Sequence, residues 1–147
     1  MIAFRLATEA DVAAVVALLA DDVLGAGREG EDLAPYRAAF ARMAEEGNNT
    51  LIVGERQGEV VATYQITFIS GLSLKAARRA QVESVRVAAA LRGQGVGALL
   101  MADAEARARA AGCSLIQLTS NAARADARRF YERLGFAPSH VGFKKSL

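Results

Sequence analysis

The chain contains only one cysteine, Cys113, and one histidine, His140, among its 147 residues. A single cysteine cannot form an internal disulfide, and these two side chains do not supply the ligand set of a structural zinc site. The composition therefore excludes a disulfide-built module and a zinc-stabilised fold, and we predict no metal. We expect Cys113 to be a small buried hydrophobe and His140 to lie on the surface or in a loop.

Long apolar runs and a strong charge imbalance are also lacking. The longest apolar stretch, residues 12–20, is well short of the roughly 20 residues that a membrane span needs. Glu9 and Asp11 interrupt the N-terminus where a signal peptide would be apolar. Eighteen Lys and Arg against sixteen Asp and Glu leave a formal net charge of +2, which is too mild to indicate a nucleic-acid or membrane partner. We therefore expect a cytoplasmic protein.

Apolar periodicity and turn residues divide the chain into strands and helices. The predicted strands lie at residues 2–6, 50–56, 59–68, 80–87 and 114–119, with a last strand or pair of strands at 136–145. The predicted helices lie at residues 9–20, 33–46, 98–111 and 123–134. An antiparallel half thus precedes a strand–helix–strand unit. This order predicts a single α/β (α+β) domain over 1–147, with one mixed, mostly antiparallel sheet of six to seven strands and helices on both faces.

Local signals support several of these boundaries. Thr8 and Asp11 are spaced as a capping box ahead of the first helix. The Gln-Gly pair at residues 57–58 is a two-residue hairpin signal between two predicted strands. On the helix at 98–111, two acidic and two basic side chains have the spacing of surface ion pairs. We therefore expect Asp103, Glu105, Arg107 and Arg109 to lie on a solvated face.

A glycine-rich turn lies between the strand at 80–87 and the helix after it. Gly93, Gly95 and Gly97 alternate there, next to Arg92. Glycine permits a positive φ and lets a ligand approach the backbone closely. The first N–H groups of a helix have no intrahelical partner, and the helix dipole adds positive charge at this end. The turn therefore predicts a phosphate or pyrophosphate site, with a purely structural turn as the alternative.

Two common nucleotide-binding motifs do not fit this turn. A P-loop ends in Gly-Lys-Ser/Thr, whereas Gly97 is followed by two apolar residues. The dinucleotide fingerprint fits Gly93, Gly95 and Ala98. It also needs an acidic residue at the end of the next strand, and residues 118–121 contain none. Both nucleotide hypotheses are therefore set aside.

Two motifs resemble those of the GNAT-type N-acetyltransferases. The pattern R-x-x-G-x-G over residues 92–97 is similar to the acyl-CoA-binding motif of that family, and F-Y-x-x-x-G-F over residues 130–136 resembles its C-terminal motif. Both occur in the family's order and at its separation, and the order of predicted elements agrees over the whole chain. The resemblance implies a GNAT-like acyl-CoA N-acyltransferase fold, with a splayed pair of parallel strands at the cofactor site.

The resemblance also implies acetyl-CoA (coenzyme A) as co-substrate, bound in the opening between those strands. Backbone groups of Val85 and Val87 would pair with the pantetheine arm, as a strand edge pairs with an added strand. Backbone N–H groups of residues 93–98 would receive the pyrophosphate, and Asn121 would bond the cofactor's amides. Asn121 is also a candidate cap of the last helix, and both roles can hold. The residues implied in cofactor binding are Val85, Arg86, Val87, Arg92, Gly93, Gln94, Gly95, Val96, Gly97, Ala98, Asn121 and Tyr131.

Two catalytic residues follow from the same resemblance. Tyr131 would act as the general acid for the departing thiolate, because a phenol with an ordinary pKa near 10 stays protonated at neutral pH. Glu83 would act as the general base, commonly through water, and strand alternation predicts its side chain on the face of Val85 and Val87. The alternatives are a tyrosine that only packs and a solvated carboxylate paired with Arg86 or a neighbouring arginine.

The resulting hypothesis is an enzyme, an acetyl-CoA-dependent N-acetyltransferase. It would move an acetyl group to a primary amine of a small molecule or peptide by direct attack in a ternary complex. The alternative is a catalytically silent acyl-CoA-binding sensor or interaction module, because its cofactor motif would be the same. The acidic segment 21–32 would suit a cationic amine, and surface solubility explains its charge equally well. The resemblance implies a homodimer as a common state.

Overall fold

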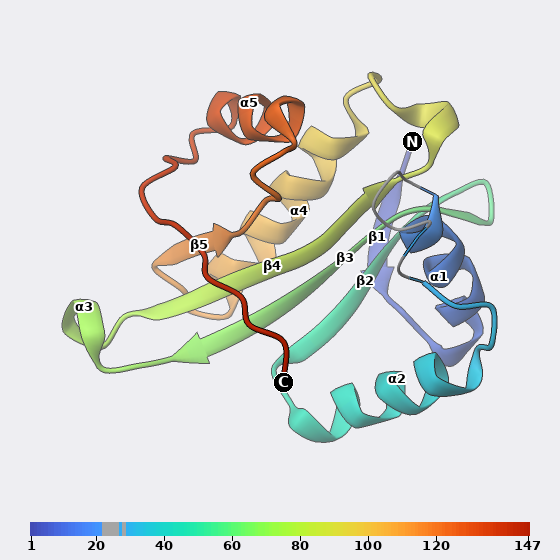
Figure 1. Cartoon of the computed structure of the whole chain (residues 1–147), viewed down its shortest axis with the longest axis horizontal. Helices are drawn as coiled ribbons and strands as arrows, with labels where there is room; N and C mark the ends of the chain where they lie inside the picture. The colour runs from blue at the N-terminus through green and yellow to red at the C-terminus, as the bar shows by residue number, and fades with distance from the viewer. Residues whose placement is uncertain (22–26, 28) are drawn as a thin grey trace.

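The computed structural model describes residues 1–21, 27 and 29–147, and Figure 1 shows the arrangement of their elements. These residues form a five-stranded sheet in the order β1-β2-β3-β4-β5. Three antiparallel pairs join β1 to β4, and β5 is parallel to β4. The strands are β1 (Ala3–Leu6), β2 (Asn49–Arg56), β3 (Glu59–Ser70), β4 (Arg78–Val87) and β5 (Leu115–Leu118). The prediction of a mixed, mostly antiparallel sheet is confirmed.

Helices lie on both faces of this sheet (Figure 1). On one side are α1 (Val12–Ala20) and α2 (Ala34–Glu46), and on the other are α4 (Val96–Ala110) and α5 (Ala125–Arg133). We call these sides the α1 face and the α4 face. A short turn, α3 (Ser73–Ala76), joins β3 to β4. Among the described residues, no helix is both long and apolar enough to cross a bilayer.

The main core lies between the sheet and α4. Alternate residues of β2, β3 and β4 point to this face because successive side chains of a strand point to opposite sides. The buried members of this core are Ile52, Ala62, Tyr64, Ile66, Ala80, Val82, Val96, Leu100, Met101, Ala104 and Ala108. On the α1 face, Val53 and Thr63 are buried where α1 and α2 cover the strands. The strand period therefore determines which side chains each helix covers.

The capping box predicted at the first helix is confirmed. The backbone N–H of Thr8 donates to Asp11 Oδ2 at 2.7 Å, and the Thr8 side chain accepts from the backbone N–H of Asp11. Arg5 of β1 donates two further bonds to the Asp11 carboxylate, at 2.8 and 3.0 Å, and one to Glu55 of β2 at 2.9 Å. The buried Asp11 carboxylate thereby joins the start of the first helix to two strands.

The predicted hairpin between β2 and β3 is confirmed as well. Gln57 and Gly58 have φ values of 52° and 82°. A two-residue turn with positive φ at both positions matches the twist of the strands that flank it. The hairpin sets the pairing of β2 with β3, in which Arg56 lies opposite Glu59.

The strand predicted at residues 136–145 is absent, so the described sheet has five strands rather than six to seven. Residues 136–147, all of which are described, contain no strand or helix. Val141 and Phe143 are 79% and 93% exposed. Pro138 lacks the N–H that a sheet ladder needs, and an extended segment becomes a strand only where another backbone pairs with it. The alternation of apolar residues predicted an extended segment, but it could not show whether a second backbone would pair with it.

Asp103 and Arg107 are half-buried, which corrects the expectation of a solvated face for these two residues, whereas Arg109 is exposed as expected. The buried Tyr64 hydroxyl donates to Asp103 Oδ2 at 2.5 Å. Arg107 donates to the same oxygen at 2.8 Å and to the Phe4 carbonyl at 3.3 Å. Burial, and then the hydrogen bond to Asp103, raises the pKa of Tyr64, so its hydroxyl stays a donor. This network holds α4 against β3 and β1.

Replacing Asp11 with asparagine should weaken the fold in a pH-dependent way. Arg5 above all, and then the Thr8 N–H, lower the pKa of the Asp11 carboxyl to about 2. That is below the unfolded value of about 4, so the stabilisation is complete above pH ~4 and is lost as the pH falls towards 2. We expect Asp11→Asn to lower the free energy of unfolding at pH 7 by about 1 to 2 kcal/mol.

The measurement is urea unfolding of both proteins at pH 7 and across the acid range. The difference between them should shrink as the pH approaches 2. Glu9→Gln, which removes an exposed carboxylate in the same turn, is the control and should change stability by less than about 0.5 kcal/mol. A difference between Asp11→Asn and wild type that stays constant from pH 7 to pH 2 would contradict the assignment.

Candidate active site

A bulge interrupts β4 next to the predicted base. Gln65 of β3 lies opposite Glu83 and Thr63 lies opposite Arg86. One β3 residue, between Thr63 and Gln65, therefore faces two residues of β4. One of these two is Ser84, whose φ of 54° is in the left-handed region that non-glycine residues rarely adopt. A bulge of this kind shifts the alternation of side chains by one residue.

The prediction that Glu83 shares a face with Val85 and Val87 is consequently wrong. Val82 is buried in the core beneath α4, and after the bulge Val85 and Val87 pack against the same core. Glu83 follows Val82 directly, so its side chain is on the α1 face of the sheet. There it is exposed. The period-2 pattern of the strand carries no signal for the extra residue.

The Glu83 carboxylate has no partner within the described part of the chain, because no hydrogen bond or ion pair from these residues reaches it. The alternative in which Arg86 pairs with it is not observed. Arg86 instead donates through Nη1 to the Val85 carbonyl at 2.9 Å. The site therefore holds an exposed carboxylate that no described cation neutralises.

The parallel strands β4 and β5 pair over only four rungs. Pairing runs from Arg79 opposite Leu115 to Val82 opposite Leu118, where β5 ends. Residues 83–87 of β4 continue without β5 beside them. An open strand edge of this kind offers backbone donors and acceptors to an amide-bearing ligand.

Guanidinium groups contact two carbonyls of this stretch. The Val87 carbonyl accepts a bond from Arg92 Nε at 3.2 Å, as the Val85 carbonyl does from Arg86. A carbonyl oxygen has two lone pairs. These contacts therefore leave each carbonyl able to accept a second hydrogen bond.

The loop before α4 presents unhindered backbone. Gly93 and Gly95 have φ values of 76° and 81°, and a Cβ at either position would meet no atom within 4 Å. Gly95 directly precedes α4, whose first N–H groups lack intrahelical partners. Free N–H groups at a helix start are suited to an anion such as a diphosphate, the group that acyl-CoA carries.

Side chains of the same loop hold it in place. Val96 is buried in the core, and Gln94 Nε2 donates to the Ala90 carbonyl at 2.9 Å. Arg92 Nη2 donates to the carbonyl of Asp21, the residue after α1, at 2.7 Å. The contact with Asp21 joins residues 71 positions apart, so no local pattern could have predicted it.

Gly97 serves a packing contact rather than a turn. It lies in the first turn of α4, and a Cβ there would be 3.0 Å from Phe130 Cζ. Very few real Cβ contacts are this short. The missing side chain lets Phe130 of α5 pack directly against the start of α4. The two sequence motifs thus meet in space through Gly97 and Phe130.

The second motif forms the end of α5. Gly135 has a φ of 94°, and its N–H donates to the Glu132 carbonyl at 3.0 Å. The N–H of Phe136 donates to the Tyr131 carbonyl at 3.1 Å. This pair of bonds is a Schellman motif, which is typically accompanied by an apolar contact across the helix end. Here the Phe136 ring meets the Tyr131 ring edge-on at 5.8 Å between centroids.

Tyr131 is held between two phenylalanines at this helix end. The Phe130 ring lies 5.0 Å from the Tyr131 ring, also edge-on. Burial raises the pKa of Tyr131, and the positive charges of Arg124 and Arg86 partly offset this effect. The hydroxyl is therefore protonated at neutral pH and can donate a proton. Tyr131 also packs against the core, so the packing alternative is compatible with a chemical role.

Asn121 shapes the turn between β5 and α5. Its side-chain oxygen accepts a bond from the Ala123 N–H at 2.9 Å, and its carbonyl accepts one from the Arg124 N–H at 2.9 Å. The residue that caps α5 is Arg124. The alternative predicted for Asn121, the helix cap itself, is therefore wrong by three residues, because an extra turn separates β5 from the helix.

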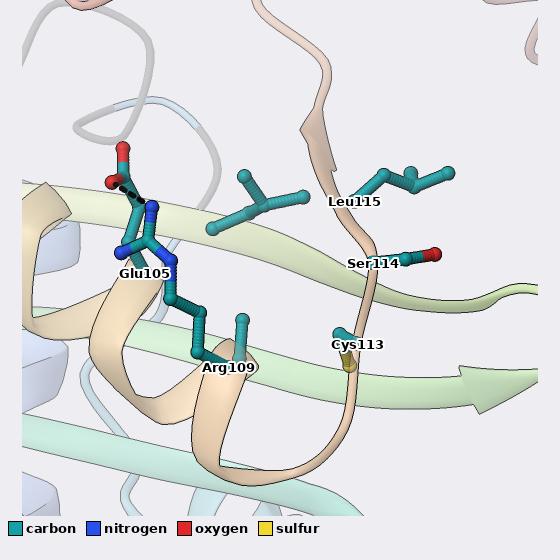
Figure 2. A pocket seen from close by; sticks show the side chains of 7 residues that line it. Glu105, Arg109, Cys113, Ser114 and Leu115 are labelled. Carbon is teal, nitrogen blue, oxygen red and sulfur yellow. Dashed lines mark ion pairs between the residues drawn. The ribbon is translucent and has the colours of Figure 1, made fainter.

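Cys113 lines a hollow of about 200 Å³ between the end of α4 and β5 (Figure 2). Arg109 and Glu105 form an ion pair at 3.5 Å on its helix side. Cys113 is half-buried, so the expectation of a buried side chain holds only in part. The hollow lies at the opposite end of α4 from the glycine loop and does not belong to the candidate site. His140 is exposed, as expected.

The acidic segment predicted between the first two helices lies partly outside the described residues. In its described part, Glu29 accepts a hydrogen bond from the Tyr36 hydroxyl at 3.0 Å. Asp32 accepts one from the Ala34 N–H at 3.0 Å. Each of these two carboxylates therefore has a local structural role. Among the described residues, no three His, Cys, Asp or Glu side chains come together as metal ligands would.

Comparison with known proteins bears on the same segments. The family model described as "Acetyltransferase (GNAT) family" matches residues 14–136. The chain is 34% identical over 143 residues to an aminoalkylphosphonate N-acetyltransferase of Salmonella typhimurium, covering 97% of this chain and 90% of that protein.

Solved structures share the fold over the full length. A Bacillus halodurans protein described as a transcriptional regulator is 43% identical, with a TM-score of 0.95 and complete coverage of both chains. A glucosamine-6-phosphate N-acetyltransferase of Arabidopsis thaliana has a TM-score of 0.81 at 17% identity, covering 99% of this chain and 98% of that one. A Clostridium acetobutylicum protein crystallised with acetyl-CoA has a TM-score of 0.77 at 18% identity, covering 99% and 96%. At such identities the last two show the fold alone.

Replacing Gly97 with valine should separate α5 from α4. The added side chain would overlap Phe130, and overpacking of this kind typically costs about 1 to 3 kcal/mol. We expect Gly97→Val to lower the thermal midpoint and to disturb the near-ultraviolet signal of the adjacent aromatic rings. Ala102→Val, at an exposed position of the same helix, is the matched control. Equal losses in the two variants would mean that helix propensity, rather than the Phe130 contact, is responsible.

Proposed function

The chain belongs to the GNAT family of acetyltransferases and transfers an acetyl group from acetyl-CoA to an amine, and from this premise we propose that a primary amine of a small molecule attacks directly in a ternary complex. The observation that carries the proposal is the stretch of β4 without β5 beside it, together with the contact of Phe130, the neighbour of Tyr131, with the start of α4 that follows the glycine loop. Acetyl-CoA bound along the edge of this stretch would reach both the N–H groups of the glycine loop, which would bind its pyrophosphate, and the protonated phenol of Tyr131. No covalent enzyme intermediate is then required.

Acetyl-CoA would be held mainly by backbone groups. The N–H groups of residues 93–98 would bind its pyrophosphate, and the carbonyl and N–H groups of Val85 and Val87 would bind the amides of its pantetheine arm. The left-handed φ of Gly93 and Gly95, with open space in front of both, supports this role. When bound, acetyl-CoA supplies the acetyl group as a thioester. Arg92 would act by holding the loop against the end of α1.

Tyr131 would donate a proton to the sulfur as the thiolate departs. Its raised pKa supports this role, because the hydroxyl remains protonated at neutral pH and above. The rings of Phe130 and Phe136 restrict its movement at the end of α5. A positioned acid of this type typically contributes 10²- to 10⁴-fold to a rate.

Glu83 would accept the proton of the attacking amine. Its exposed carboxylate has no described partner, so it is available to an incoming ammonium group. Because its side chain is on the α1 face, we expect the acceptor to approach from that side. The carboxylate would act through a water molecule where it does not reach the amine directly.

A small acceptor is supported by the Salmonella typhimurium relative, which is named for aminoalkylphosphonates. A cationic amine would fit the free carboxylate of Glu83. The homodimer expected from the resemblance stays a proposal, supported by the exposed apolar side chains of Val141 and Phe143. The cytoplasmic location likewise stays a prediction.

Thermal shift measurements test the cofactor site. Coenzyme A at about 100 times its dissociation constant should add about 2.7 kcal/mol of stability and raise the midpoint by roughly 5 to 10 °C. Pantetheine lacks the pyrophosphate and is the matched control ligand, so it should produce a much smaller shift at the same concentration. Equal shifts from both ligands would refute the diphosphate role of the glycine loop.

Replacing Tyr131 with phenylalanine tests the proposed acid. We expect Tyr131→Phe to lower kcat by about 10²-fold or more, with coenzyme A affinity within about twofold of wild type. The raised pKa further predicts that wild-type kcat does not fall at alkaline pH until above about 10. Thiol release from acetyl-CoA with a panel of amines, measured from pH 6 to 10, provides both quantities. Near-full activity of Tyr131→Phe would show that another group protonates the sulfur.

A further inference from the structure

On the α1 face, β4 presents a line of three polar side chains, Arg79, Gln81 and Glu83. The residues between them, Ala80 and Val82, are buried in the core beneath α4. The pairing with β3 is continuous from Arg79 to Glu83, so these three side chains share the opposite face. At two residues per repeat, the Cα atoms of Arg79 and Glu83 are about 13 Å apart.

The two charged ends of this line have no described partner. No hydrogen bond or ion pair from the described residues reaches the guanidinium of Arg79 or the carboxylate of Glu83. Arg78 precedes Arg79 and lies on the α4 face, and its guanidinium does have partners. Its guanidinium lies over the Phe68 ring at 5.8 Å and donates to the Ser70 hydroxyl at 3.2 Å. A cation and an anion thus stand unpaired on one strand face.

Between these charges, a row of polar side chains crosses four strands. The register places Asn49 opposite Thr67, Thr67 opposite Gln81, and Gln81 opposite Gln117. Gln117 Nε2 donates to Gln81 Oε1 at 2.7 Å, and the Thr67 hydroxyl lies 3.3 Å from Asn49 Oδ1. After the bond between the two glutamines, this pair still has amide donors and a carbonyl acceptor for a ligand.

We propose that this surface binds the acceptor, and that Arg79 selects amines that also carry an anionic group such as a carboxylate or a phosphonate. The inference rests on the proposed function, because Glu83 marks the end at which the amine loses its proton. Arg79, with a long side chain and a forked guanidinium, binds the anionic end in a bidentate manner. The carboxamides of Gln81 and Gln117 contact the middle of the acceptor.

The test compares a matched pair of acceptors, 3-aminopropylphosphonate and propylamine, by thiol release from acetyl-CoA. Wild type should have the higher kcat/KM with the phosphonate. Arg79→Gln should raise KM for the phosphonate by about 10- to 100-fold, change kcat little, and leave propylamine within about twofold. Arg79→Lys should restore part of the loss. Arg78→Gln, the adjacent arginine on the other face, should leave the preference between the two acceptors unchanged.

Two results would overturn the assignment. One is a wild-type enzyme that uses propylamine as well as the phosphonate, and the other is equal effects of Arg79→Gln and Arg78→Gln in proteins with unchanged thermal midpoints. Failure of the proposed function gives a different result. In that case wild type releases no thiol with either acceptor or with any other small amine, although coenzyme A still raises its midpoint.

Discussion

The extra residue at Ser84 is the constraint on which the arrangement of the site depends. Before it, even-numbered residues of β4 face α4, and after it odd-numbered ones do, as Val82 and Val85 show. One strand can therefore direct Val82, Val85 and Val87 towards α4 and still present Glu83 on the other side. A regular strand would have kept Glu83 and Val85 on the same face, so either Val85 would have left the core or the carboxylate would have entered it, where an unpaired charge is costly.

The second constraint is the contact between α4 and α5. Gly97 admits Phe130 at the start of α4, and the Schellman bonds at Gly135 place Phe136 against Tyr131. These contacts attach the end of α5, which carries Tyr131, to the first turn of α4. Glycine thus has two separate uses in the site. Gly93 and Gly95 permit left-handed backbone, whereas Gly97 leaves room for a ring.

Much of the fold was predictable because it follows from local periodicity. The capping box at Thr8 and the hairpin at residues 57–58 depend on a few adjacent residues, and both formed as predicted. The predicted strand at 136–145 had suitable alternation, yet the described chain offers it no backbone partner. Asp103 and Arg107 had the spacing of a surface pair, but Tyr64 from a distant strand brought them into a half-buried network.

For this protein, the sequence by itself determined the order of the elements, the glycine loop and the family resemblance, because each depends on residue type and short spacing. Only the tertiary structure decided the face on which Glu83 lies, the attachment of Arg92 to Asp21 and the polar row that ends at Gln117. Each of these depends on strand register or on contacts between distant segments. Register results from the packing of the whole sheet, and no window of neighbouring residues contains that information.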